Sequence, residues 1–175
     1  MRGGLAEAPL KLSIVIPVYN EERLILGVLR RVAAVPADKE LVVVDDCSRD
    51  GTRAILSRIE EDPSLVASAD PTGRTQVRIF RQPVNRGKGA ALRRGFAEAR
   101  GEVVVVQDAD LEYDPHELPR LLDRIARGDA DVVYGSRFSR GSAGFPFWHT
   151  TATVRSPAMT SLRSWMLFSR PTLSG

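Results

Sequence analysis

The sequence has a single cysteine and no long apolar run. Because Cys47 is the only cysteine among 175 residues, an internal disulfide is excluded, and we assign this thiol no role as a nucleophile or metal ligand. No stretch approaches the ~20 consecutive apolar residues that a membrane-spanning helix requires. Residues 1–10 contain no apolar run either, which argues against a secretory signal and predicts a short flexible N-terminus. We therefore expect a cytoplasmic protein.

Acidic residues are missing from the last forty positions. Residues 136–175 hold five arginines and no Asp or Glu, whereas the whole chain carries a formal net charge of +3, so residues 1–135 are slightly acidic. The basic segment also contains several Phe and Trp residues. This combination fits a segment that lies peripherally on the anionic cytoplasmic face of a membrane, and it fits a disordered end equally well. We expect no nucleic-acid partner.

Short apolar runs alternate with segments of helical period. Strands buried on both faces are indicated at residues 12–18, 41–44, 77–80, 103–106 and 132–134. This order predicts an α/β fold with a mostly parallel sheet and helices on both faces, and 175 residues suffice for one such domain. Asn20 is predicted to cap the first helix, and Ser48 or Asp50 the second. Residues 62–76, with two prolines and a glycine, are interpreted as a surface insertion.

Polar residues follow the predicted strands, at the edge of a parallel sheet where ligands usually bind. Asp108 and Asp110 come one residue apart after a buried strand. Such a carboxylate pair suits Mg²⁺ or Mn²⁺, which keeps further positions for water and phosphate oxygens, and Glu112 offers another oxygen. Carboxylate pairs also occur in solvated turns. The metal hypothesis therefore depends on the position of this pair after a strand.

Three other nucleotide-binding folds lack their signatures here. A dinucleotide fold needs Gly-x-Gly-x-x-Gly after the first strand, and residues 17–21 contain no glycine. A Walker motif requires Ser or Thr after its lysine, whereas Gly89 follows Lys88. A sugar nucleotidyltransferase would also carry a glycine-rich loop after its first strand, which this sequence lacks.

Four motifs together resemble those of family 2 glycosyltransferases with the GT-A fold. They are Ile14–Glu21, Val44–Thr52, Asn85–Ala90 and Gln107–Pro115. With Tyr134–Phe138 added, the sequence resembles most closely the branch that transfers mannose or glucose to dolichyl or polyprenyl phosphate. The resemblance covers about residues 11–149, which we interpret as a GT-A nucleotide-sugar-binding domain followed by an atypical basic and aromatic tail at 150–175.

The resemblance implies roles in nucleoside binding for residues at the first two strand ends. Pro17, Tyr19 and Glu21 would line the nucleoside pocket. Asp46 would meet the base or the ribose, while Asp45 would hold its loop together.

The resemblance likewise implies a metal and phosphate site further along the chain. Asp108, Asp110 and Glu112 would be the metal ligands, and Asp108 would also lie near the ribose. Arg137 would contact phosphate, so Asp110 and Arg137 are the expected catalytic residues. Lys88 is expected to contact an anion of the donor.

The implied reaction transfers a sugar from a nucleotide-diphosphate sugar, of the UDP-glucose or GDP-mannose type, to a polyprenyl phosphate. A phosphate monoester is largely ionised at neutral pH because its second pKa is about 6, so this acceptor requires no catalytic base. The metal and Arg137 would stabilise the departing nucleoside diphosphate, and the anomeric centre would be inverted.

The family pattern changes after Thr151. Residues 152–175 contain no acidic residue for the acceptor-side motif that the family leads us to expect, and their composition suggests a reading-frame change near residue 152. We therefore expect the C-terminal part of the fold to be incomplete. Two alternatives to a membrane-surface transferase remain open. One is a donor-binding remnant without transfer activity, and the other is a soluble family 2 transferase with a sugar acceptor, for which we find no base.

Overall fold

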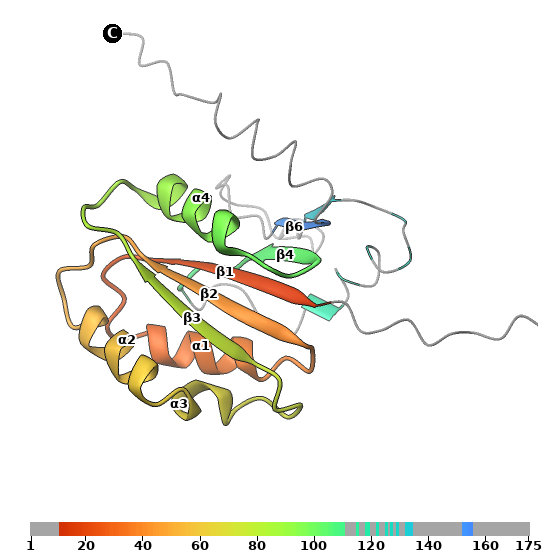
Figure 1. The fold of residues 1–175 in the computed structure, drawn as a ribbon, viewed down its shortest axis with the longest axis horizontal. Coiled ribbons are helices and arrows are strands. Elements are labelled where there is room, and N and C mark those ends of the chain that lie inside the picture. Colours follow the sequence, from red (N-terminus) through yellow and green to blue (C-terminus); the bar gives the residue numbers. More distant parts are fainter. Residues whose placement is uncertain are drawn as a thin grey trace, which may run out of the picture.

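A six-stranded sheet with the strand order β3-β2-β1-β4-β6-β5 is the centre of the fold (Figure 1). The computed structural model describes residues 11–110, 115, 118–119, 122, 125, 127, 129, 132–134 and 152–155. The strands are β1 (Leu12–Val18), β2 (Lys39–Asp45), β3 (Gln76–Arg81), β4 (Val103–Val106), β5 (Val132–Tyr134) and β6 (Ala152–Arg155). The first four run parallel, whereas β6 is antiparallel to both of its neighbours. The predicted, mostly parallel sheet is confirmed.

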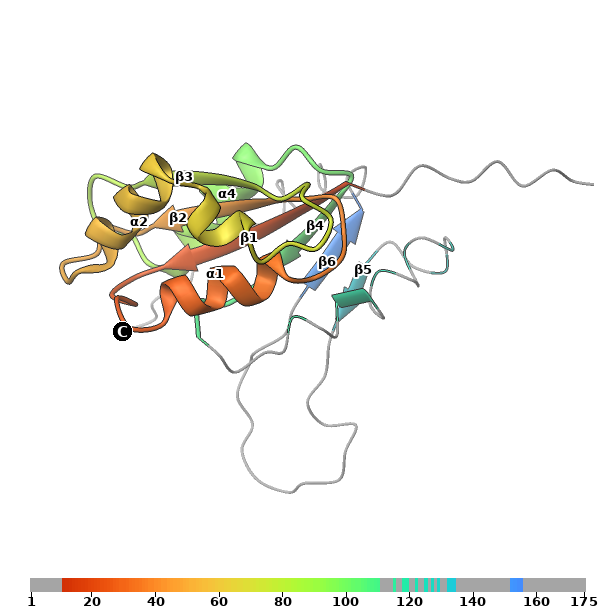
Figure 2. The same ribbon diagram turned by 90° about the horizontal axis from the view of Figure 1, so that it is seen from below.

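Helices cover both faces of this sheet, as the sequence predicts (Figures 1 and 2). One face carries α1 (Ile25–Ala33), α2 (Thr52–Glu61) and α3 (Ser64–Ala67), and the opposite face carries α4 (Lys88–Glu98). On α1, the residues Ile25, Val28, Leu29 and Val32 recur every three or four positions, and all four are buried against the sheet. Within the described ranges, no helix is both long and apolar enough to cross a membrane.

Helix α4 lies very close to the sheet because Gly95 faces β1. A Cβ atom at this position would lie 2.2 Å from Cγ1 of Val15, so a larger side chain would have to displace the helix or the strand. Ala91 on the same helix is buried with Val15, Val42 and Val44. This packing fixes the position of the first residue of α4, Lys88, near the edge at which β1 and β4 end.

Residues 152–155, which the sequence analysis assigned to a basic tail, form strand β6. This strand pairs with β4 through Val103–Val105 and with all three residues of β5. None of the strands predicted from sequence lies at these residues. The reason is the brevity of β6, because four residues that include Thr and Arg show too little apolar alternation to be recognised as a strand from sequence.

Residues 62–76 are also more than a surface insertion. They contain α3, with Val66 fully buried, and Asp70, which is almost completely buried. Asp70 accepts hydrogen bonds from the backbone N–H groups of Thr72, Arg74 and Thr75 and from both Thr hydroxyls. Its Oδ1 also lies 3.7 Å from Nζ of the buried Lys39 at the start of β2. The segment is thus attached to the core through a buried ion pair.

We expect Asp70 to make the folded state sensitive to acid. Burial acts to raise the pKa of its carboxyl, but the hydrogen bonds from Thr72 and Thr75 outweigh burial and hold this pKa well below its ordinary value. A carboxyl whose pKa falls on folding stabilises the folded state above its ordinary pKa of about 3.9, and this contribution is lost as the pH falls further.

Asp70→Asn should therefore reduce the pH dependence of the free energy of unfolding between about pH 4 and pH 2, by up to about 1.4 kcal/mol per pH unit. Urea titrations at several pH values would measure how the free energy of unfolding changes with pH in the original protein and in Asp70→Asn. Thr75→Val, which removes one donor, should give a smaller change in the same direction. Identical slopes for the Asp70→Asn variant and the original protein would contradict this prediction.

Candidate functional site

The loops after β1, β2, β3 and β4 meet at one edge of the sheet because these four strands are parallel. Three backbone hydrogen bonds connect the loops where the strands end. The N–H of Asp46 donates to the carbonyl of Val18 at 2.8 Å, that of Gln107 to Val15 at 3.0 Å, and that of Gln82 to Asp45 at 2.8 Å. The strand-end residues predicted from sequence are thus brought together.

Pro17 explains why the sheet opens between β1 and β4 at this edge. Strand β1 pairs with β2 as far as Val18, but it pairs with β4 only as far as Val15. Proline has no backbone N–H to continue a second ladder. The chain after β4 therefore leaves the sheet beside Pro17. The first exposed residue after β1 is Tyr19, which is 42% exposed.

The loop after β1 is attached to the loop after β2 by contacts nearly thirty residues apart in sequence. The N–H of Asn20 donates to Oγ of Ser48 at 2.9 Å, and Oδ1 of Asn20 accepts from the N–H of Arg49 at 2.8 Å. The N–H of Glu21 donates to Oγ1 of Thr52 at 2.8 Å. Asn20 has a positive φ of 56° and precedes α1 by several residues, so the prediction that it caps α1 is wrong. Its role is to connect two loops.

At the start of α2, Asp50 rather than Ser48 bonds to the first N–H of the helix, as one of the two predicted alternatives has it. The residue before this helix is Gly51, which makes no side-chain cap, while Oδ1 of Asp50 accepts a hydrogen bond from the N–H of Thr52 at 3.0 Å. Gly51 donates its N–H to Oε2 of Glu22 at 2.6 Å, and a Cβ atom on Gly51 would lie 2.8 Å from that oxygen. This glycine therefore allows the first loop to approach the second closely.

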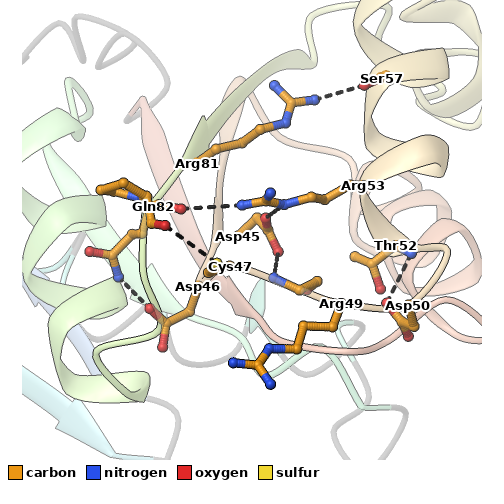
Figure 3. Close-up of polar contacts among 12 residues, drawn as sticks. Asp45, Asp46, Cys47, Arg49, Asp50, Thr52, Arg53, Ser57, Arg81 and Gln82 are labelled. Carbon is orange, nitrogen blue, oxygen red and sulfur yellow. Dashed lines mark hydrogen bonds and ion pairs between the residues drawn. The ribbon is translucent and has the colours of Figure 1, made fainter.

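Asp45 and Asp46 are both buried, but their carboxylates point in different directions (Figure 3). Asp45 accepts from the N–H of Ser48 at 3.0 Å and from Nε of Arg53 at 2.8 Å, so it stabilises its own loop. Asp46 accepts from Nε2 of Gln82 at 2.7 Å and from the N–H of Arg86 at 2.9 Å.

Both hydrogen bonds to Asp46 reach the same atom, Oδ1. For the second oxygen, Oδ2, the described part of the chain provides no hydrogen-bond donor. One of the two carboxylate oxygens of Asp46 is thus not used by a described donor. Sequence reasoning missed Gln82, although it directly follows β3 and the same strand-end rule applies to it.

Asp108 and Asp110 lie in the loop after β4 and are partly exposed. Nζ of Lys88, at the start of α4, lies 2.7 Å from Oδ1 of Asp108. Burial raises the pKa of the Glu21 carboxyl, and the negative charges of Asp110 and Asp50 raise it further. Carboxylates from three loops thus lie within electrostatic reach of one another.

The predicted metal ligands are only partly described. Among the described residues, no three His, Cys, Asp or Glu side chains are grouped as a metal site. Glu112 and Arg137 lie outside the described residues. The carboxylates of Asp108 and Asp110 nevertheless fit a divalent cation, because Mg²⁺ often binds through one or two carboxylates together with water and substrate phosphates.

Comparison with known proteins identifies the family. The model of the family described as glycosyl transferase family 2 matches residues 13–173, which extends beyond the residue 149 at which the motif resemblance ends. An undecaprenyl-phosphate 4-deoxy-4-formamido-L-arabinose transferase of Pseudomonas aeruginosa (strain LESB58) is 38% identical over 140 residues, which are 78% of this chain and 38% of that protein. A dolichol-phosphate mannosyltransferase of Pyrococcus furiosus is 35% identical over 143 residues, covering 79% and 37%. The chain thus spans about two fifths of these relatives.

Solved structures show the same fold. The mannosyltransferase PcManGT from Pyrobaculum calidifontis, in complex with GDP-Man and Mn²⁺, matches with a TM-score of 0.69 and 25% identity over 90% of this chain and 47% of that one. TarS of S. aureus, residues 1–349, matches with a TM-score of 0.63 and 22% identity over 87% and 49%. The predicted GT-A arrangement is confirmed, and the chain belongs to glycosyl transferase family 2.

Proposed function

We propose that this domain binds a nucleotide-diphosphate sugar together with Mg²⁺ or Mn²⁺ and transfers the sugar to a polyprenyl phosphate with inversion. The observation that carries this proposal is the meeting of Asp46, Glu21 and the Asp108–Asp110 loop at one edge of the sheet. Membership of the family supports it, as do the names of relatives that act on undecaprenyl phosphate or dolichol phosphate.

The nucleoside would bind beside the ends of β1 and β2. The aromatic ring of Tyr19 is exposed at this edge, next to the buried Pro17. Oδ2 of Asp46 would accept a hydrogen bond from a base N–H or a ribose hydroxyl, since Oδ1 is already bonded to Gln82 and Arg86. Both uracil and guanine carry such N–H groups, so the proposal includes UDP and GDP sugars.

The divalent cation would be held by Asp108 and Asp110, with Glu112 as a further ligand. Such a cation would supply positive charge at the two phosphates. This charge stabilises the negative charge that develops on the nucleoside diphosphate as it leaves. Glu21 and Asp108 would also help to orient the nucleoside of the donor. Arg137 would contribute a second positive charge to the leaving phosphate.

The protein would then act mainly by positioning the two substrates. An ionised acceptor phosphate needs no proton removed before it attacks the anomeric carbon, so none of the carboxylates at this edge has to act as a base. Because the acceptor is anchored in a bilayer, the domain would work at a membrane surface.

A transfer assay tests this function. We expect radiolabelled sugar from UDP-glucose or GDP-mannose to reach polyprenyl phosphate in the presence of Mn²⁺. This transfer should be slow with this chain and faster with a chimera that carries the P. furiosus relative's sequence in place of residues 150–175. The reason is that residues 152–175 contain no acidic residue for the acceptor-side motif that the family leads us to expect. Comparable rates would show that residues 150–175 already form a working acceptor side, and label found only on water-soluble sugars would contradict the proposed acceptor.

A further inference from the structure

Lys88 forms an ion pair with one of the proposed metal ligands. Its Nζ lies 2.7 Å from Oδ1 of Asp108, which is an ideal distance for a charge-assisted hydrogen bond. The Asp108 side chain is only 13% exposed, whereas that of Lys88 is 53% exposed. The lysine therefore approaches a mostly enclosed carboxylate from the solvent side.

The backbone around Lys88 is fixed from both directions. Gly87 has a φ of 81°, a conformation that favours glycine, and Lys88 begins α4 directly after it. Upstream, the N–H of Arg86 donates to Asp46, and downstream Gly95 packs against β1. The Cα atom of Lys88 therefore has little freedom, while its flexible side chain can reach more than one partner.

A divalent cation at Asp108 would repel the Lys88 ammonium. Both positive charges would then share one carboxylate at contact distance, in surroundings where solvent screens them only in part. A nucleotide diphosphate that arrives with the cation brings negative charge to the same place. The Lys88 side chain would therefore lose one anionic partner and gain another when the donor binds.

We propose that Lys88 is a positioning residue that exchanges Asp108 for the diphosphate of the donor. In the ligand-free domain it neutralises Asp108, and in the complex it binds a phosphate oxygen beside the cation. This inference rests on the proposed function, and it adds that Lys88 couples the binding of the cation to the binding of the nucleotide. The ammonium competes with the cation when the cation is alone, and it favours the cation and the nucleotide when they are together.

The test replaces Lys88 by methionine, which has a similar length and no charge. Mn²⁺ alone should bind Lys88→Met about three- to tenfold more tightly than the original protein, because the competing ammonium is gone. UDP or GDP at saturating Mn²⁺ should bind the variant less tightly by a similar or larger factor. Calorimetric titrations measure both affinities, and urea titrations of each protein establish that it is folded.

Arg93→Met is the matched control. Arg93 is an exposed cation on the same helix, one turn and more beyond Lys88. Its loss should leave the Mn²⁺ affinity nearly unchanged, and Lys88→Arg should retain most of the nucleotide affinity.

Two results would overturn the exchange while leaving the proposed function intact. One is metal-dependent nucleotide binding by the original protein with no gain in Mn²⁺ affinity in Lys88→Met. The other is an equal gain in Arg93→Met, which would indicate a general effect of net charge. Failure of the original protein to bind nucleotide under any metal condition would overturn both proposals.

Discussion

Replacing Asp110 by asparagine is expected to weaken the binding of the nucleoside diphosphate by about a hundredfold in the presence of Mn²⁺. The substitution removes a negative charge and the better oxygen ligand while it preserves the size of the side chain. The negative charge of Asp110 raises the pKa of the Glu21 carboxyl. The Asp110 carboxylate therefore lies within electrostatic reach of the loop after β1. Loss of one charged contact to a cation shared with the diphosphate is worth about 1.5–3 kcal/mol, or about 10- to 150-fold in affinity.

Glu61→Gln is the matched control, because it makes the same chemical change on an exposed residue at the far end of α2. It should leave nucleotide affinity unchanged. In EDTA, the original protein and Asp110→Asn should bind the nucleotide equally weakly. An Asp110→Asn variant that keeps the full effect of Mn²⁺ would show that the metal binds elsewhere.

Replacing Glu40 by alanine is expected to cost about 3–5 kcal/mol of the free energy of unfolding. Glu40 is buried in β2 and accepts from Oγ of Ser13 at 2.5 Å, from the N–H of Arg100 at 2.6 Å and from Nη1 of Arg78 at 2.9 Å. Burial acts to raise the pKa of its carboxyl, but the hydrogen bonds from Ser13, Arg100 and Arg78 outweigh burial and lower it. Without Glu40, the largely buried guanidinium of Arg78 loses its nearest carboxylate and the buried hydroxyl of Ser13 loses its acceptor, while the N–H of Arg100 keeps only its longer bond to Oγ of Ser13 at 3.1 Å.

Glu98 provides the control, because it contacts the same guanidinium from a more exposed position. It lies 3.4 Å from Nη2 of Arg78, with 27% of its side chain exposed. Glu98→Ala should cost less than about 1 kcal/mol. Urea titrations of the two variants measure the difference, and similar losses would contradict the view that burial, rather than the number of ion pairs, makes Glu40 important.

The sequence predicts much of this site because parallel strands end at one edge. Apolar runs mark β1, β2 and β4, so Asp46 and Asp108 could be assigned to the same edge from sequence. The side chains that pair with these carboxylates could not be assigned in the same way. The pairing of Lys88 with Asp108 depends on where α4 crosses the sheet, which is fixed by the contact of Gly95 with Val15.

Local rules fail where a distant segment supplies a stronger contact. Asn20 has the composition of a helix cap, but Ser48 and Arg49 bond to it from the next loop, and its backbone takes a positive φ instead. Asp70 appeared to belong to a polar surface loop, yet its burial beside Lys39 depends on a strand more than thirty residues away. Such contacts follow from tertiary packing and leave no short-range pattern in the sequence.

Titration of UDP and GDP against the folded protein, with Mn²⁺ and with EDTA, tests the central claim most directly. The proposed site predicts that at least one of the two nucleotides binds with Mn²⁺, and that its affinity falls at least about tenfold when EDTA removes the metal. Equal affinity in Mn²⁺ and in EDTA, or no binding of either nucleotide, would contradict a metal-dependent nucleotide-sugar site at the ends of β1, β2 and β4.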